Sequence, residues 1–74
     1  MSIADKYKMM QEANRMKKEF DKACKKKEKE QAQEAAAKIN ALFADAITKG
    51  YCGQRDADKV KNYCEKQLTK KGLK

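Results

Sequence analysis

The chain has 74 residues with no proline, no tryptophan and no histidine, and it has only three glycines. Proline and glycine are the residues that most disfavour a helix interior, and neither occurs between Ser2 and Lys49. Most positions in this stretch are alanine, glutamate, lysine, glutamine or other residues that lose little side-chain freedom in a helix. The sequence therefore predicts helix almost throughout residues 2–49.

The missing histidine and the shortage of hydroxyl side chains argue against catalysis. Ser2 is the single serine, Thr48 and Thr69 fall at expected helix ends, and the three scattered glycines form no phosphate-binding loop. Without histidine, and without closely spaced cysteine pairs, the chain also lacks the usual four ligands of a zinc site. We therefore expect no enzyme activity, no metal ion and no cofactor.

The cysteines are three in number, Cys24, Cys52 and Cys64. An odd number in a chain without a secretory signal is typical of reduced thiols that are buried as small apolar groups. A disulfide between Cys52 and Cys64 is compatible with the spacing only in an oxidising environment.

The balance of charge is basic, with a net charge of +8 and 41% charged residues of both signs. Such a chain is attracted to anionic surfaces. Only Arg15 and Arg55 among the 19 basic residues are arginine, and lysine lacks the planar fork that reads base edges, which disfavours sequence-specific nucleic-acid recognition. No apolar run approaches the roughly 18 residues of a membrane span, and no signal peptide is visible, so we expect a cytoplasmic protein.

Residues 3–24 carry apolar side chains at spacings of three and four, as on one face of a helix. Ser2 followed by Asp5 is a helix start signal. The apolar stripe drifts around the helix in the manner of a repeat closer to 3.5 than to 3.6 residues per turn, which favours left-handed pairing with another helix.

Residues 25–31 contain no apolar side chain. Opposite charges at helical spacing, such as Lys26 with Glu30, favour continuation of the helix through this segment. We therefore predict one continuous helix over about residues 3–49. The alternative is a break near Lys25–Gln31, which would produce a three-helix bundle.

Residues 32–47 form an alanine-rich apolar face that allows close helix packing. Gly50 with Tyr51, and Gly72 with Leu73, are typical of helix C-termini that end in a left-handed glycine. We predict a loop over 50–55 and a second helix over about 56–71, opened by Asp56. A short loop returns this helix antiparallel, so the fold class is all-α, a single small domain over 1–74 with a helical hairpin.

The two helices of this hairpin differ greatly in length, about 70 Å against about 22 Å at 1.5 Å per residue. The second helix then leaves residues 3–28 uncovered, together with their large apolar side chains. We predict that these residues bind a partner or pair with a second copy of the chain: Ile3, Tyr7, Met9, Met10, Met16 and Phe20.

The functional hypothesis is a non-enzymatic regulatory or inhibitory protein that binds a protein partner through a helical surface, as a homodimer. The alternative is non-specific nucleic-acid binding, in which lysines follow the phosphate backbone. The candidate contacts for an anionic surface are Lys17, Lys18, Lys22, Lys25, Lys26 and Lys29. Interspersed acidic residues weaken this alternative. A helix lying on a membrane surface is disfavoured because the apolar face is small and has no tryptophan.

Overall fold

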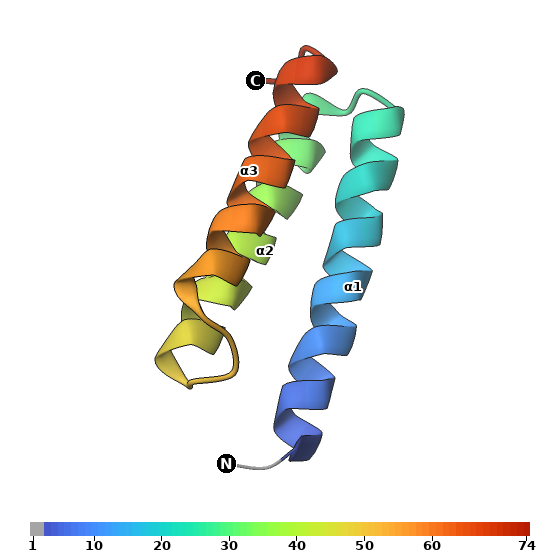
Figure 1. Cartoon of the computed structure of the whole chain (residues 1–74). Helices are drawn as coiled ribbons and strands as arrows, with labels where there is room; N and C mark the ends of the chain where they lie inside the picture. The colour runs from blue at the N-terminus through green and yellow to red at the C-terminus, as the bar shows by residue number, and fades with distance from the viewer. Residues whose placement is uncertain (1–2) are drawn as a thin grey trace.

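The computed structural model describes residues 3–74, so Ser2, the predicted start of the first helix, lies outside the described residues. Within that range the chain forms α1 (Ile3–Lys25), α2 (Lys29–Thr48) and α3 (Gln54–Lys70), and no strand (Figure 1). The all-helical prediction is confirmed. The prediction of one continuous helix over 3–49 is wrong, and the arrangement is consistent with the three-helix alternative.

The break between α1 and α2 occurs at a lysine rather than at a glycine. Lys27 adopts a left-handed backbone conformation, with φ of 56°. The Glu28 N–H donates to the Ala23 carbonyl at 2.9 Å and the Lys27 N–H donates to the Cys24 carbonyl at 3.1 Å, which is the Schellman pattern of a helix C-terminus. The chain accepts this conformation at a cost of about 1–2 kcal/mol for a residue with a Cβ atom.

The other two helices end in the same way but with glycine, as the sequence predicted. Gly50 has φ of 78°, and the Tyr51 N–H donates to the Ala46 carbonyl at 2.8 Å. Gly72 has φ of 71° and is followed by Leu73, which turns back into the core and is 5% exposed. Each apolar residue after the glycine therefore covers the last turn of its own helix.

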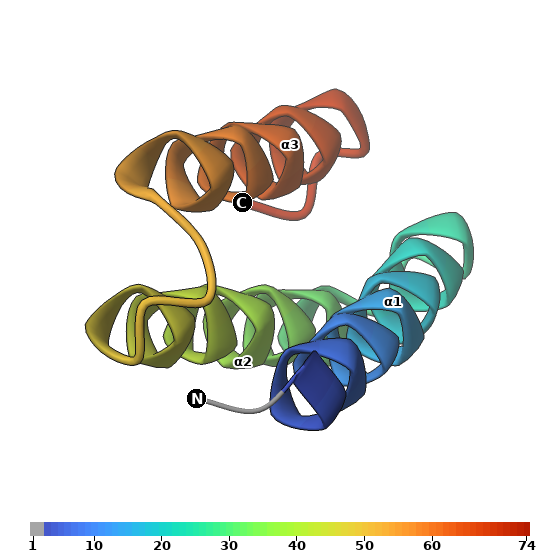
Figure 2. The ribbon, with the colours of Figure 1, turned by 60° about the horizontal axis from the view of Figure 1, so that its bottom comes forward.

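The middle helix, α2, contacts both of the others. Figure 2 shows α1 and α3 on different sides of α2, so the three axes do not form a closed triangle along their whole length. The molecule is elongated, with principal extents of 40 × 19 × 13 Å. Among residues 3–74, no helix is both long and apolar enough to cross a membrane.

The larger core cluster lies where all three helices meet, near the α1–α2 turn and the C-terminus. Phe20 is completely buried there beside Ala32 and Ile39 of α2 and Leu68 of α3. The Gln33 side-chain amide donates to the Leu73 carbonyl at 2.8 Å and holds the C-terminal residues against α2. The predicted alanine-rich face of α2 is thus buried, as its small side chains allow close packing.

A smaller core cluster joins α1 to α2 at the opposite end of the molecule. Its buried members are Met9 and Ala13 of α1 and Ala46 of α2, and Phe43 contacts both clusters. The α2–α3 loop contributes Tyr51 and Cys52, which are half-buried. This end of the molecule therefore has two helices in close contact and the third joined to them through a loop.

The first turn of α3 begins two residues earlier than predicted. Gly53 precedes the helix, and its N–H donates to the Asp56 carboxylate at 3.3 Å. Asp56 therefore satisfies a backbone donor from within the first turn, where a negative charge also complements the helix dipole. Gln54 and Arg55, predicted as loop, are helical.

Candidate protein-binding groove

The residues predicted to bind a partner separate into two groups in the structure. Phe20 is 0% exposed and Met9 is 9% exposed, and Met16 packs against the larger core cluster. By contrast, Ile3, Tyr7 and Met10 are 89%, 62% and 52% exposed. The first group is covered by the protein's own α2 and α3, so a binding surface has to be built from the second group and its neighbours.

The contacts between α1 and α3 are concentrated around one side chain, Tyr63. Its hydroxyl donates to Asp21 Oδ1 at 2.5 Å, and its ring lies edge-on to Phe20 with centroids 6.1 Å apart. The Lys17 ammonium lies 4.9 Å from the centre of the same ring, within the range of a cation–π interaction. We name this group, Lys17, Phe20, Asp21 and Tyr63, the aromatic clasp.

The hydrogen bond of the clasp alters the acidity of Tyr63. Donation to the Asp21 carboxylate, together with partial burial and the negative charge of Asp21, raises the pKa of the Tyr63 hydroxyl to about 12. The tyrosine therefore stays protonated, and the hydrogen bond stays in place, over the whole neutral range.

Beyond the clasp, toward the N-terminus of α1, α1 and α3 separate and a groove opens between them. Its volume is about 440 Å³. The α1 wall carries Met9, Met10 and Ala13, the α3 wall carries Val60, and Phe43 of α2 lies between the walls. The groove is apolar along its length because these five side chains are aliphatic, aromatic or thioether groups. We name it the α1–α3 groove.

The groove is open because the α3 wall loses bulk toward its N-terminus. Val60 stands one helical turn before Tyr63 and is too short to span to α1 as the tyrosine ring does. Asp56, one turn further back, bonds to the Gly53 N–H and provides no apolar cover. Two walls are therefore held at a fixed separation by the clasp, with no side chain of the described residues filling the space between them.

Polar side chains stand at the edges of the groove. Lys6 and Asn14 lie on the α1 side, and Asp56 and Lys59 lie on the α3 side. Within residues 3–74, neither Lys6 nor Lys59 forms an ion pair. The free charges at the groove edge are therefore positive on both walls.

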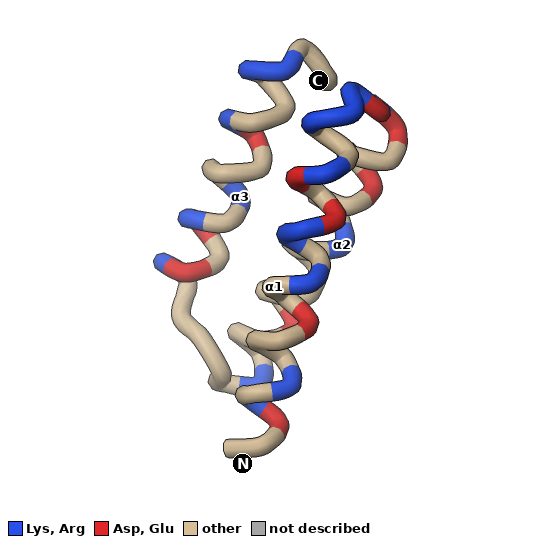
Figure 3. Tube along the Cα trace, turned by 90° about the vertical axis from the view of Figure 1, so that its right-hand side faces the viewer, with Lys and Arg blue, Asp and Glu red and all other residues tan. Residues whose placement is uncertain are grey.

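The lysines proposed for an anionic surface do not form an uninterrupted cationic stripe. Figure 3 shows acidic residues interspersed with the lysines along α1. Lys22 and Lys26 share a surface hollow with Glu19, Glu28 and further residues of α2. Their side chains are exposed, as are those of Lys18, Lys25 and Lys29, whereas the Lys17 ammonium lies on the Tyr63 ring in the clasp.

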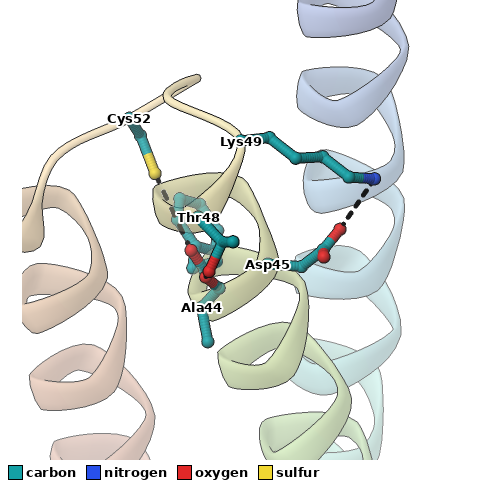
Figure 4. A network of polar contacts seen from close by, with 6 residues as sticks. Ala44, Asp45, Thr48, Lys49 and Cys52 are labelled. Atoms are coloured by element: carbon teal, nitrogen blue, oxygen red, sulfur yellow. Dashed lines mark hydrogen bonds and ion pairs between the residues drawn. The ribbon is translucent and has the colours of Figure 1, made fainter.

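The three cysteines are free thiols and lie at different depths. Cys24 and Cys64 are buried in the larger core cluster, and burial, followed by the nearby Cys24, raises the pKa of the Cys64 thiol to about 11. Cys52 is half-buried at the edge of the groove, where its Sγ lies 3.9 Å from the Phe43 carbonyl oxygen (Figure 4). Burial and the charge of Asp56 raise the pKa of Cys52, while Lys6 lowers it.

The C-terminal turn of α2, next to Cys52, is fixed by local contacts. The Thr48 hydroxyl donates to the Ala44 carbonyl at 3.2 Å, and the Lys49 ammonium lies 3.0 Å from the Asp45 carboxylate (Figure 4). These exposed contacts are each worth less than about 1 kcal/mol, but they keep the loop that follows in a single path. The loop residues Tyr51 and Cys52 thus form a defined end of the groove.

No residues between 3 and 74 bring three or more histidine, cysteine, aspartate or glutamate side chains together as ligands for a metal ion. Comparison of the chain with protein-family models, with curated proteins and with solved structures finds no match. The function is therefore argued from the geometry of this surface.

Several groove residues were outside the sequence-based prediction. Phe43 and Val60 were assigned to the packing faces of their helices, and Lys6 and Lys59 stood out in no pattern. The only sequence signal that points to them is the helix break at Lys27, because folding at that position is what places α1 next to α3.

Proposed function

We propose that this protein is a non-enzymatic regulatory or inhibitory protein that binds a partner protein through the α1–α3 groove and the adjoining exposed side chains of α1. The observation that carries the proposal is the apolar groove of about 440 Å³ beside a half-exposed Met10, on a chain with a net charge of +8. Exposed apolar patches of this kind mark interaction sites.

The energies indicate that the groove and the exposed residues act together. Covering the exposed parts of Ile3, Tyr7 and Met10 contributes about 3–6 kcal/mol before the costs of association are subtracted. A micromolar complex needs about 8 kcal/mol net. A partner therefore has to enter the groove and contact Met9, Phe43 and Val60 as well.

Methionine is suited to such a surface. Its unbranched side chain adapts to differently shaped partners, and its sulfur makes favourable contacts with aromatic rings. Met9 and Met10 stand side by side on the α1 wall, the first buried and the second half-exposed. This pair provides a packed base and an adjustable contact at the same position.

The expectation of a homodimer rested on a long helix without cover. Because the chain turns at Lys27 and α2 covers Met9, Ala13 and Phe20, that reason no longer applies. Self-association through Ile3, Tyr7 and Met10 is measurable in solution as a mass above 8.5 kDa by light scattering.

The test compares two variants in a capture experiment at high salt. Tyr7→Ser with Met10→Ser changes only exposed side chains, so the variant stays folded, as circular dichroism will show. The matched control is Lys18→Gln with Lys22→Gln, which lowers the charge on another part of α1. We expect the first variant to lose a stoichiometric protein partner and the control to retain it.

The same pair of variants separates protein binding from nucleic-acid binding. A protein that follows the phosphate backbone loses affinity with each lysine removed and loses it steeply between low and moderate salt. If the control variant loses its ligand while the Tyr7 and Met10 variant keeps it, the groove is not the binding site and the proposal is wrong.

A further inference from the structure

The walls of the α1–α3 groove determine what kind of segment fits it; the inference rests on the proposed function. Both walls are helices, and their backbone groups are bonded within α1 and α3. They offer no free edge to which an extended strand could pair. A helix satisfies its own backbone hydrogen bonds and presents only side chains, so it is the element that can lie between two helices and over a third.

The length of the site sets the length of the helix. Lys6 to Asn14 spans about 12 Å of α1, and Ile3 to Lys17 spans about 21 Å, at 1.5 Å per residue. Tyr63 in the clasp closes one end, and Tyr51 with Cys52 marks the other. A guest helix of about 14 residues, or four turns, covers this distance.

The charges at the groove edge select the flanks of that helix. Lys6 stands on the α1 side and Lys59 on the α3 side, both without an ion-pair partner among residues 3–74. The only acidic residue that lines the groove, Asp56, accepts a hydrogen bond from the Gly53 N–H. A helix between the walls therefore meets an unpaired positive charge on each side.

We propose that the α1–α3 groove binds an amphipathic helix of a partner protein, with an apolar face toward Phe43 and acidic residues on both flanks. A second copy of this chain does not fit this description. Each copy carries a net charge of +8, and an α1 or α3 guest would place further lysines against Lys6 and Lys59.

The test uses two synthetic 14-residue peptides with the same leucine face and the same helix-stabilising staple on the outer side. One peptide has glutamate at the flanking positions, and the other has lysine there. Binding is followed by the NMR signals of the Met9, Met10 and Val60 methyl groups at low salt. We expect the glutamate peptide to shift these signals and to bind at least about fivefold more tightly than the lysine peptide.

A charge-reversed protein provides the matched control. Lys6→Glu with Lys59→Glu leaves the apolar lining intact, and we expect it to prefer the lysine peptide. Equal affinity of the two peptides for the original protein, or shifts confined to methyl groups outside the groove, would overturn the acidic-helix inference. Absence of any shift at millimolar peptide, or displacement of neither peptide's signals because the protein dimerises, would overturn it too.

The outcome is separate from that of the capture experiment. If the Tyr7 and Met10 variant loses its protein partner but the peptides show no charge preference, the proposed function stands and the chemistry of the partner helix is different. If the peptides bind as expected but the variant keeps its cellular partner, the proposed function fails while the groove remains selective for acidic helices.

Discussion

Replacing Tyr63 by phenylalanine removes one hydroxyl group from the point where α1 and α3 meet. The ring keeps its edge-on contact with Phe20 and its position under the Lys17 ammonium, because phenylalanine has the same ring. What is lost is the hydrogen bond from the hydroxyl to Asp21 Oδ1, 2.5 Å long in the native protein. The substitution therefore isolates the polar part of the clasp.

The size of the effect follows from the type of bond. Hydrogen bonds to charged groups contribute about 1.5–3 kcal/mol when buried, and solvent at this partly exposed site lowers the value to about 1 kcal/mol. For a domain of this size, 1 kcal/mol corresponds to a fall in Tm of about 4–8 °C. The variant should fold and should unfold at a measurably lower temperature at neutral pH.

The dependence on pH provides a second signature. The pKa of Tyr63 is about 12 in the folded protein and 10.0 for an ordinary tyrosine, so the folded state holds the proton more tightly. This contribution to stability is complete below pH 10 and is lost as the pH rises through 12. The difference in unfolding free energy between the native protein and Tyr63→Phe should therefore shrink between pH 10 and 12.

Urea unfolding followed by circular dichroism, repeated from pH 7 to pH 12, measures both signatures. Other groups that titrate in this range, such as the Cys64 thiol with a pKa of about 11, are present in both proteins and cancel in the difference. Tyr7→Phe is the control, since Tyr7 is 62% exposed and outside the clasp. Equal stability of the native protein and Tyr63→Phe at pH 7 would refute the role given to the clasp.

Three further predictions concern the core, the helix break and the thiols. Phe20→Ala removes a completely buried ring and should destabilise the protein by about 3–5 kcal/mol in urea unfolding; a loss under 1 kcal/mol would show that the core is elsewhere. Lys27→Gly relieves a left-handed lysine and should raise the unfolding free energy by about 0.5–1 kcal/mol, whereas a continuous helix would be destabilised by the same change. Cys52 should react with a thiol reagent before Cys64, whose buried thiol has a pKa of about 11, and mass spectrometry of the labelled peptides will give the order; faster labelling of Cys64 would contradict the burial described.

The helix content and most helix ends could be predicted from the sequence because they depend on local chemistry. The absence of proline and glycine before Gly50 predicts helix, and Gly50 and Gly72 mark two C-termini that the structure confirms. The alanine-rich face of α2 was likewise predictable as a packing surface, since small side chains allow helices to approach.

The break at Lys27 was not predictable from local preferences. Residues 25–31 favour a continuous helix, and the turn costs about 1–2 kcal/mol in backbone strain. Folding back buries Phe20 and Cys24 against α2, and complete burial of a phenylalanine alone contributes about 1.5–3 kcal/mol. Contacts between residues far apart in the sequence therefore outweigh the local preference.

The candidate site changed for the same reason. Six residues of α1 were predicted to be uncovered, and the turn at Lys27 buries Met9 and Phe20 while leaving Ile3, Tyr7 and Met10 exposed. Which face of α1 stays open depends on where α2 and α3 lie. Helical periodicity defines the apolar face, but the topology decides which part of it remains accessible.

Site-specific photo-crosslinking tests the claim that the α1–α3 groove and its rim bind a protein partner most directly. One form of the protein carries p-benzoylphenylalanine in place of Tyr7, at the exposed rim, and another carries it in place of Lys18, which lies outside the groove. We predict that irradiation in cells links the first form to one protein partner, through a helical segment of that partner, and leaves the second form unlinked. Equal crosslinking from both positions, or a product that contains only two copies of this chain, would contradict the account.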